Sequence, residues 1–246
     1  MPRLSIIIPT KNEEAHLPKL LATIAAQSYA DYEVVVADAA STDRTPELAA
    51  SSGARVVAGG LPGPGRNRGA EAATGEILLF LDADVQLPSH KFLDECLQEM
   101  SRKQLDLATC KVKPLSRKPV DRALHEAYNA YVVATERLRP HAPGFCIFST
   151  GDSHRRISGF DETVVFAEDH DYVQRAAKAG SRFGILRSHP IRVSVRRLEK
   201  DGRLGIALKY VYSELHMLAK GSFKDLPFTY EMGGEEGENG KTTCPR

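Results

Sequence analysis

The chain has 246 residues, enough for one large domain or for one domain with appendages, and its 42% hydrophobic content is sufficient for a sizeable core. Its 33 basic and 32 acidic side chains leave a formal net charge of +1, so no global field would attract nucleic acid, and we expect no nucleic-acid partner. The four cysteines form no CxxC pair, which argues against a zinc site or a disulfide framework and favours a reducing compartment.

The start of the chain and its apolar runs argue against export and membrane insertion. Met1 is followed almost directly by a strand-like run, which leaves no room for a signal peptide. No apolar run approaches the roughly 20 residues that are needed to span a bilayer. We therefore expect a cytoplasmic protein that is soluble or lies at the inner face of the plasma membrane.

In the first half of the chain, apolar runs of strand length alternate with segments of helical spacing. The first run is expected to stop at Pro9, and Asp43 is placed to cap a helix that has Pro46 in its first turn. Strands are expected at residues 4–8, 33–37, 55–57, 77–81 and 106–112, and helices at 13–27, after Asp43, at 66–73 and at 91–101. This alternation implies βαβ units and an α/β fold with a mainly parallel central sheet flanked by helices.

The second half is less regular. Helices are expected at 121–137, 168–179 and 202–220, a loop and strand at 140–150, and a pair of short strands at 182–195. The end of the chain, residues 233–246, is rich in glycine and glutamate and has no means of burying apolar surface, so we expect it to be disordered.

Two carboxylates follow the buried-type run at residues 77–81. Asp82 and Asp84 have one residue between them, at a point where the chain must turn, so both can converge on one hard divalent cation, which prefers oxygen ligands. Open α/β sheets bind ligands at this carboxyl edge. A solvent-facing acidic turn is the alternative. Gln86 either offers its carbonyl oxygen to the same ion or is an ordinary polar residue before Pro88.

Two other segments of this half have both a functional and a structural interpretation. Asp38 ends the second expected strand, where its carboxylate could accept hydrogen bonds from a base or a ribose; an Asx turn with a helix cap explains it equally well. The glycine-rich segment 59–65 before Arg66 could let backbone approach a pyrophosphate, whose charge guanidinium groups would counter, or it is a flexible connection. It does not match the GxGxxG pattern.

A second acidic cluster lies in the first turn of the helix expected at 168–179. Glu168, Asp169 and Asp171 stand where the helix macrodipole favours negative charge, which accounts for one or two of them. Three acids together with His170 exceed what a cap needs. A general base is therefore the preferred interpretation of this cluster.

Positive charge and an apolar stripe mark the last third of the chain. Arg196 and Arg197 are expected to end a short strand, where they either neutralise a leaving diphosphate or form a solvated pair. The helix expected at 202–220 carries apolar residues on one side, and such a stripe either rests on a membrane surface or, more often, packs on its own domain. The stripe consists of Leu204, Ala207, Leu208, Val211, Leu215 and Leu218.

Taken in order, five segments resemble the family 2 glycosyltransferases with the GT-A fold, over roughly residues 3–200. Each segment is a weak signal alone, but five in this order and spacing are specific. The resemblance implies a nucleotide-diphospho-sugar donor, a Mg²⁺ or Mn²⁺ ion bound through the DxD motif, and transfer of a hexose with inversion to a glycan, lipid-linked or small-molecule acceptor. The segments are 8–14 (IPTKNEE), 38–43 (DAASTD), 82–84 (DAD), 159–162 (GFDE) and 168–169 (ED).

The resemblance also implies roles for individual residues. Asp84 would bind the metal, Asp82 would face the ribose or a metal-bound water, and Asp169 would be the catalytic base. The run Asp-Ala-Asp-Val-Gln is similar to that of polyprenyl-phosphate mannose synthases, which places Gln86 among the metal ligands. The other assigned positions are Pro9, Thr10, Glu13, Glu14, Asp38, Arg66, Ala83 and Arg196 on the donor side, and Gly159, Phe160 and Glu168 on the acceptor side.

The chain departs from the family pattern in two places. Ala39 and Ala40 follow Asp38 where the family usually has Asp-Gly-Ser, which removes one polar contact to the nucleoside. The Gln-x-x-Arg-Trp motif of processive members is absent and the chain has no tryptophan, so a processive polysaccharide synthase is not expected.

The alternatives are a polyprenyl-phosphate sugar transferase, a nucleotidyltransferase and a non-catalytic nucleotide-sugar-binding protein. A nucleotidyltransferase usually has a Gly-x-Gly-Thr-Arg-type loop after its first strand, and this chain has Pro-Thr-Lys-Asn-Glu-Glu. Retention of Asp84 and Asp169 argues against a mere binder. We expect one domain over 1–232, with a donor half at about 1–112, an acceptor and catalytic half at about 113–200, and an amphipathic helix region at 201–232.

Overall fold

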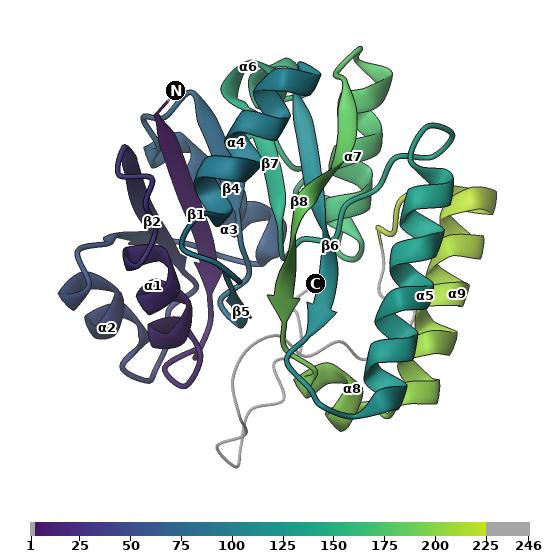
Figure 1. Cartoon of the computed structure of the whole chain (residues 1–246), viewed down its shortest axis with the longest axis horizontal. Coiled ribbons are helices and arrows are strands. Elements are labelled where there is room, and N and C mark those ends of the chain that lie inside the picture. The colour runs from purple at the N-terminus through teal and green to yellow at the C-terminus, as the bar shows by residue number, and fades with distance from the viewer. Residues whose placement is uncertain (1–2, 225–246) are drawn as a thin grey trace.

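The computed structural model describes residues 3–224, and an eight-stranded sheet with the order β3-β2-β1-β4-β7-β6-β8-β5 forms their centre (Figure 1). The strands are β1 (Leu4–Thr10), β2 (Tyr32–Asp38), β3 (Arg55–Ala58), β4 (Ile77–Phe80), β5 (Val85–Gln86), β6 (Leu107–Pro114), β7 (Ile147–Thr150) and β8 (Phe183–Val193). The helices are α1 (Leu17–Ala25), α2 (Thr45–Ser51), α3 (Pro62–Ala72), α4 (Phe92–Lys103), α5 (Pro119–Thr135), α6 (Gly151–Arg156), α7 (Glu168–Lys178), α8 (Arg196–Lys200) and α9 (Arg203–Lys220).

The sheet is mixed but mainly parallel, as expected, because six of its eight strands run in one direction. Strands β3, β2, β1 and β4 are parallel neighbours, as the alternating pattern of the first half predicts. Strand β7 runs antiparallel to both β4 and β6, β5 runs antiparallel to β8, and β6 and β8 are parallel. The expected mainly parallel sheet is therefore confirmed, with β7, which follows α5, and the short β5 as its two antiparallel strands.

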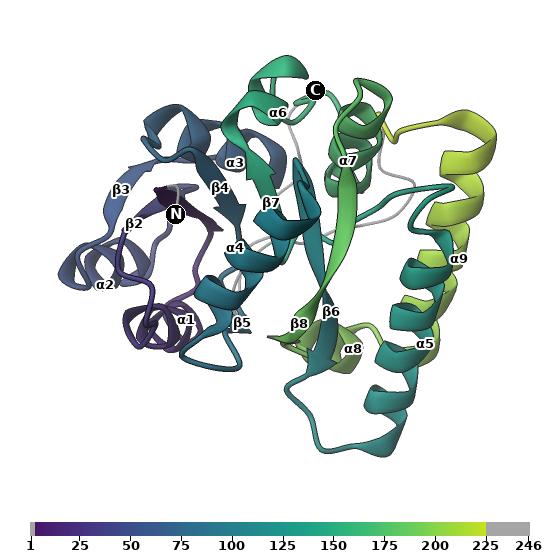
Figure 2. The ribbon, with the colours of Figure 1, turned by 45° about the horizontal axis from the view of Figure 1, so that its top comes forward.

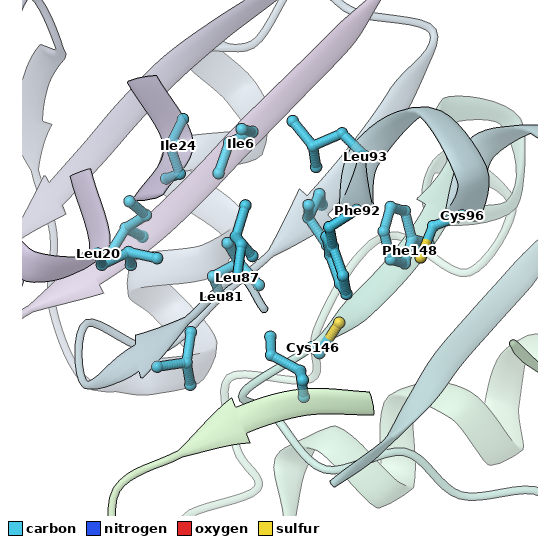
Figure 3. Packing of buried hydrophobic residues seen from close by; sticks show 14 of the residues in the cluster. Ile6, Leu20, Ile24, Leu81, Leu87, Phe92, Leu93, Cys96, Cys146 and Phe148 are labelled. Atoms are coloured by element: carbon cyan, nitrogen blue, oxygen red, sulfur yellow. The ribbon is translucent and has the colours of Figure 1, made fainter. Parts of the chain in front are cut away.

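Helices cover both faces of the sheet (Figure 2). Alternate residues of β1 serve the two faces, because successive side chains of a strand point in opposite directions. Ile6 packs into one buried cluster with α1 and α4, and Ile7 packs into the other with residues of α7. The first cluster, part of which Figure 3 shows, includes Ile6, Leu20, Ile24, Leu81, Leu87, Phe92, Leu93, Cys96, Cys146 and Phe148.

Strand β1 continues through Pro9 instead of stopping there. Ile7 accepts a hydrogen bond from the amide of Leu81 on its β4 side, and Pro9, two residues further on, faces the same side. Pairing with β4 ends at Phe80, so the missing N–H of Pro9 costs no ladder hydrogen bond. The strand therefore carries Thr10 to the carboxyl edge, in register with Asp38 of β2.

The glycine-rich segment is largely the first turn of helix α3, which begins at Pro62, and not a loop. Its glycines let the helix approach the sheet. A Cβ at Gly69 would lie 2.3 Å from Ile7 Cγ2, and one at Gly65 would lie 3.2 Å from Pro9 Cβ. A flexible connection is therefore wrong for residues 62–65, and approach of this backbone to a pyrophosphate stays a prediction.

Other boundaries differ from expectation. The strand pair expected at 182–195 is the single strand β8, with a register shift opposite the Cys110–Val112 step of β6. Arg196 and Arg197 begin helix α8 instead of ending a strand, and β5, α6 and α8 are elements that the sequence did not indicate. The first helix begins at Leu17 rather than at residue 13, with a proline in its first turn.

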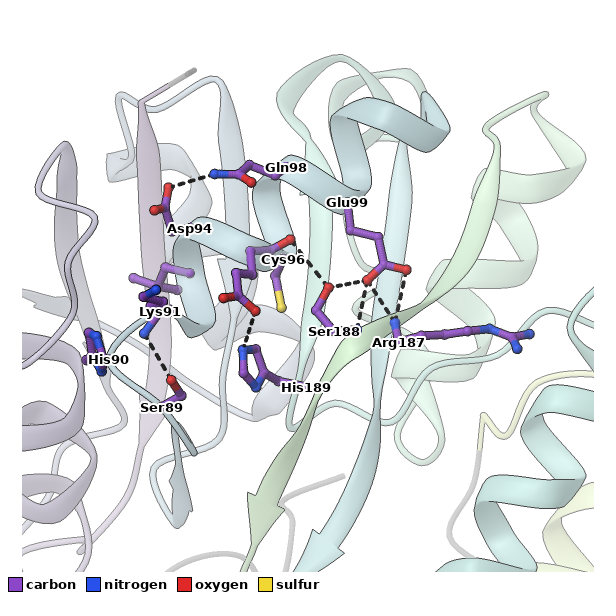
Figure 4. Close-up of polar contacts among 12 residues, drawn as sticks. Ser89, His90, Lys91, Asp94, Cys96, Gln98, Glu99, Arg187, Ser188 and His189 are labelled. Atoms are coloured by element: carbon purple, nitrogen blue, oxygen red, sulfur yellow. Dashed lines mark hydrogen bonds and ion pairs between the residues drawn. The ribbon is translucent and has the colours of Figure 1, made fainter.

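Glu99 of α4 stabilises the irregular part of β8 (Figure 4). Its carboxylate accepts hydrogen bonds from the backbone amides of Arg187 and Ser188, at 2.9–3.0 Å, and from the Ser188 hydroxyl, and it pairs with Lys103 at 2.6 Å. Burial by itself would raise the pKa of Glu99, but these donors hold it at about 2. A charged glutamate thus replaces the ladder bonds that the register shift interrupts.

Helices α5 and α9 lie side by side in both overall views (Figures 1 and 2). Arg203 at the start of α9 pairs with the buried Asp121 of α5, at 2.7 Å. Three leucines of the expected apolar stripe of α9 face outward: Leu204, Leu208 and Leu215 are 74%, 62% and 60% exposed. The more usual interpretation of this stripe, packing on its own domain, is therefore wrong for these three leucines.

Between residues 3 and 224, no helix combines the length and the apolarity that crossing a bilayer requires. The expected disordered tail at 233–246 lies outside the described residues, as does the eight-residue end of the expected domain at 225–232.

Candidate active site

The carboxyl ends of β1 and β2 meet at Thr10 and Asp38. The Thr10 hydroxyl donates a hydrogen bond to Asp38 Oδ1 at 2.9 Å, and the hydroxyl and amide of Ser41 donate to the same carboxylate at 2.6 and 2.8 Å. The Asp38 carboxylate is thus held within its own loop, by the amide three residues on rather than by the amide two residues on that defines an Asx turn. A contact between Asp38 and the base of a bound nucleotide stays a prediction. Its position is suitable, since the half-buried carboxylate lies at the carboxyl edge, where open α/β sheets bind ligands.

Asp43 fulfils its expected role before α2. Its Oδ1 accepts hydrogen bonds from the amide and the hydroxyl of Thr45, at 3.0 and 2.5 Å, and Pro46 lies in the first turn of that helix. This arrangement fixes the loop that follows β2 beside the segment after β1.

Glu13 and Glu14 differ sharply in environment. Glu14 is exposed and pairs with Arg44 at 3.3 Å, whereas Glu13 is buried and forms two hydrogen bonds with Arg196, at 2.9 and 2.6 Å. Burial raises the pKa of Glu13, and Arg196 opposes that rise. Both carboxylate oxygens of Glu13 are engaged by Arg196, and the assignment of Glu13 to the nucleoside pocket stays a prediction.

The DxD segment leaves the sheet directly after β4. Ala83 is buried, so its side chain belongs to the core rather than to a donor pocket, and it is flanked by two less buried carboxylates. Asp82 accepts a hydrogen bond from Arg66 at 2.8 Å, and Asp84 pairs with Arg196 Nε at 2.9 Å. Desolvation raises the pKa of Asp82, which Arg66 lowers and the neighbouring Asp84 raises.

Arg66 of α3 joins the two halves of the site. Its buried guanidinium donates to Glu168 at 2.7 Å, to Asp82 at 2.8 Å and to the Gly144 carbonyl at 3.3 Å. It also lies over the Phe160 ring, 5.4 Å from the ring centre. One side chain thus holds the DxD segment against the start of α7, a role that the sequence did not indicate.

Asp169 lies next to this guanidinium at the start of α7. Its Oδ2 accepts a hydrogen bond from the Gly144 amide at 2.5 Å, and its Oδ1 accepts one from the His170 amide at 2.8 Å. Ala167, just before the helix, has a φ of 56°, a strained conformation of the kind that clusters at functional sites. These contacts fix the orientation of the Asp169 carboxylate.

Gly144 is a site residue that sequence reasoning missed. A Cβ there would lie 2.3 Å from Arg66 Nη2 and 3.4 Å from Asp169 Oδ2, so only glycine admits both contacts. The signal in the sequence is faint: a Pro-Gly pair in the segment before β7. Glu168 is the remaining partner of Arg66 in this cluster. Burial and the charge of Asp169 raise the pKa of Glu168, and Arg66 opposes that rise.

Gly159 and Phe160, assigned to the acceptor side, form a turn whose Phe160 ring packs against the guanidinium of Arg66. Phe160 is 2% exposed and stacks on Tyr172 at 4.0 Å, so its side chain faces the core and not an acceptor. Gly159 has a φ of +73°, and a Cβ there would lie 2.5 Å from Asn67 Oδ1. Asn67, a second residue that the sequence did not indicate, holds this turn by two hydrogen bonds to the Phe160 backbone.

Asp82 and Asp84 suit a divalent cation. Each already faces a cationic side chain, Arg66 or Arg196, and Mg²⁺ is commonly held by one or two carboxylates with water and phosphate oxygens in the other positions. Within residues 3–224 no group of three or more His, Cys, Asp or Glu side chains is arranged to hold a metal. Gln86 is half-buried on β5, in register with Arg192 of β8, and its role as a ligand stays a prediction.

The fold is the GT-A fold, a mixed sheet flanked by helices with the acidic DxD segment at its carboxyl edge. Residues 5–160 match the family described as Glycosyl transferase family 2. Because the match covers more than half of the chain, the protein belongs to this family, which confirms the resemblance.

Three relatives illustrate the similarity. The 4,4'-diaponeurosporenoate glycosyltransferase of Staphylococcus haemolyticus is 37% identical over 110 residues, 41% of this chain and 29% of that protein. The mannosyltransferase PcManGT from Pyrobaculum calidifontis, solved with GDP-Man and Mn²⁺, has a TM-score of 0.71 at 24% identity, covering 90% of this chain and 66% of its own. S. aureus TarS 1-349 with UDP-GlcNAc has a TM-score of 0.64 at 23% identity, covering 78% and 58%. The chain thus spans under a third of the first relative, and the two structures show the fold alone.

Proposed function

We propose that the protein is an inverting glycosyltransferase that moves a hexose from a UDP- or GDP-sugar to a hydroxyl of a glycan, a lipid-linked or a small-molecule acceptor. The observation that carries the proposal is the Arg66 network, in which one buried guanidinium bonds Asp82, Glu168 and the carbonyl of Gly144, whose amide holds Asp169. It brings the acidic edge of β4 close to a carboxylate that can accept a proton.

Asp84, with Asp82 and Gln86 beside it, would hold the Mg²⁺ or Mn²⁺ ion on which the proposed reaction depends. When bound, such an ion acts as a Lewis acid that stabilises negative charge on the departing nucleotide. Arg66 fixes Asp82 at this edge, and Arg196 supplies positive charge beside Asp84. The mannosyltransferase solved with Mn²⁺ supports the choice of a divalent ion.

Asp169 takes the proton of the acceptor hydroxyl as the new glycosidic bond forms on the face opposite the leaving nucleotide, which gives inversion. The carboxylate is held by two backbone amides, and its remaining lone pairs are available for this transfer. With a polyprenyl-phosphate acceptor, the second candidate acceptor class, the nucleophile is already ionised, and Asp169 would position it rather than deprotonate it.

A thermal-shift screen tests the donor assignment. UDP or GDP with Mn²⁺ is expected to raise the melting temperature by several degrees, since saturating a site at 100 times Kd stabilises a protein by about 2.7 kcal/mol. EDTA should abolish the shift, and the matching nucleoside without phosphates should give little. If neither diphosphate shifts the transition in the presence of Mn²⁺, the proposed donor class is wrong.

We also propose that α9 rests on a membrane surface, which would bring a lipid-linked acceptor to the site. The support is the outward stripe of Leu204, Leu208 and Leu215, in a helix whose Ser213 is buried instead. Helices with one large apolar face bind bilayers in proportion to the apolar area they bury.

Vesicle co-sedimentation checks this assignment. Replacing Leu208 and Leu215 by glutamate should reduce the bound fraction by at least about tenfold, because two leucines lose burial worth about 1.5–3 kcal/mol each. Leu61→Glu is the matched control: this leucine is 45% exposed next to α3, in the other half of the molecule, and binding should not change. Equal binding of the double variant and the control would refute membrane contact through α9.

A further inference from the structure

Three charged side chains from distant parts of the sequence, Glu13, Asp84 and Arg196, are linked by ion pairs at the carboxyl edge of the sheet, where we propose that the donor binds. Arg196, at the start of α8, forms a two-pronged contact with Glu13 through Nη1 and Nη2, at 2.9 and 2.6 Å. Its third nitrogen, Nε, lies 2.9 Å from Asp84 Oδ2. The side chains of Glu13, Asp84 and Arg196 are 6%, 16% and 38% exposed, so Arg196 is the most solvent-accessible of the three.

We propose that Arg196 is a resident counter-ion of Asp84 that yields this carboxylate to the metal, and that Glu13 is the positioning residue that keeps Arg196 beside the diphosphate afterwards. The inference rests on the proposed metal-dependent function. It gives the two-bond contact between Glu13 and Arg196 a task in donor binding that differs from contact with the nucleoside.

The geometry of the guanidinium supports an exchange of partners. Arg196 uses both terminal nitrogens on Glu13, in the planar two-bond arrangement that is strongest between arginine and a carboxylate. Only Nε is spent on Asp84. Asp84 can therefore turn to a metal ion while the fork to Glu13 stays intact.

The anchoring of Glu13 makes it a fixed support. Its backbone amide donates to the hydroxyl of Thr45 at 2.8 Å, which ties it to the start of α2, and its carboxylate is buried. A buried carboxylate needs a charged partner, because leaving it unpaired costs several kcal/mol. Arg196 is that partner, so the guanidinium remains at the donor edge whether or not Asp84 is bound to it.

The local charge balance also favours the exchange. Glu13 and Asp84 each carry one negative charge and Arg196 one positive charge, so the three together are net negative without a metal. A divalent ion on Asp84 reverses that sign, and a diphosphate carries the charge that suits the reversed site. Asp82 is not one of these three side chains; it and Glu168 share the single positive charge of Arg66.

Calorimetry with Mn²⁺ alone tests the counter-ion role. Arg196→Ala is expected to bind Mn²⁺ about three- to tenfold more tightly than the unchanged protein, because the competing guanidinium is gone from Asp84. The same variant should bind UDP or GDP with Mn²⁺ more weakly, since the diphosphate loses a positive neighbour. Arg196→Lys, which retains the charge, should restore Mn²⁺ affinity toward that of the unchanged protein.

Two further variants distinguish a Glu13 that positions Arg196 from a Glu13 that itself binds the metal. Glu13→Gln loosens Arg196 and should weaken nucleotide binding without tightening Mn²⁺ binding. The double variant with Arg196→Ala should keep the tight Mn²⁺ binding, which shows that Glu13 is not itself the ligand. Arg44→Ala is the matched control, an arginine paired with the neighbouring Glu14 but 78% exposed, and it should change neither measurement.

The outcomes distinguish this inference from the proposed function. If Arg196→Ala binds Mn²⁺ no more tightly while the unchanged protein binds a nucleoside diphosphate, the counter-ion role is overturned and the donor assignment stands. If the unchanged protein binds neither UDP nor GDP with Mn²⁺, the proposed function fails whatever the Mn²⁺ result.

Discussion

Asp169→Asn is expected to lower turnover by about 10²–10⁴-fold, the usual contribution of a positioned general base. Asparagine has nearly the same shape but cannot accept the proton of the acceptor hydroxyl. Donor affinity should change little, because Asp84 and Arg196, on the other side of the Arg66 network, are untouched. Initial rates at saturating donor and acceptor, with donor affinity from calorimetry, measure the two quantities separately.

The control for this experiment is Asp171→Asn in the same helical turn. Asp171 pairs with Arg175 at 2.6 Å and accepts a hydrogen bond from Ser222, away from Gly144, so its loss should leave turnover within about threefold. A melting curve confirms that each variant is folded. Retained turnover in Asp169→Asn with a hydroxyl acceptor would eliminate Asp169 as the base, and retention only with a phosphate acceptor would favour the positioning role.

Asp84→Asn is expected to abolish the metal-dependent part of donor binding. An amide is a neutral and weaker ligand for a hard cation than a carboxylate, and losing a ligand should cost at least the 10–100-fold that follows from disturbing its supporting contacts. Calorimetric titration of the nucleoside diphosphate identified by the thermal-shift screen, with Mn²⁺ present, gives the affinity.

Removing the metal provides the internal control for Asp84. EDTA should weaken binding to the unchanged protein by about as much as the substitution does, and it should have no further effect on Asp84→Asn. A variant in which Asp94 is replaced by asparagine has lost a half-buried carboxylate in the first turn of α4 and should retain metal-dependent binding. Unchanged binding by Asp84→Asn would remove Asp84 from the metal site.

Patterns that are local in sequence predicted the DxD segment well. The run Ile77–Phe80 is buried throughout, and β4 is a central strand, so the residues that follow it had to emerge at a ligand-binding edge. The acidic turn at Glu168 and Asp169 was found in the same way, since a helix start was visible from its spacing. Both predictions depend only on the residue at which a strand ends or a helix begins.

Partners that are remote in sequence were not predictable. Glu13 and Arg196 are 183 positions apart and Arg66 and Glu168 are 102 apart, and no periodicity connects them. The sequence therefore placed Glu13 after β1 but did not indicate that its partner is Arg196. Gly144 and Asn67 were missed for the same reason, because their importance lies in what surrounds them.

The sequence by itself determined the α/β class, the parallel N-terminal strands and the carboxylates at their carboxyl ends. These features could be predicted because the period of a strand or helix, and the residue at which it ends, depend on residues that are neighbours in sequence. Only the tertiary structure decided the antiparallel entry of β7, the outward face of α9 and the choice of partner for each charge. Those depend on which surfaces the folded chain brings together, where burial makes an unpaired charge costly and so fixes Arg66 and Arg196 on their carboxylates.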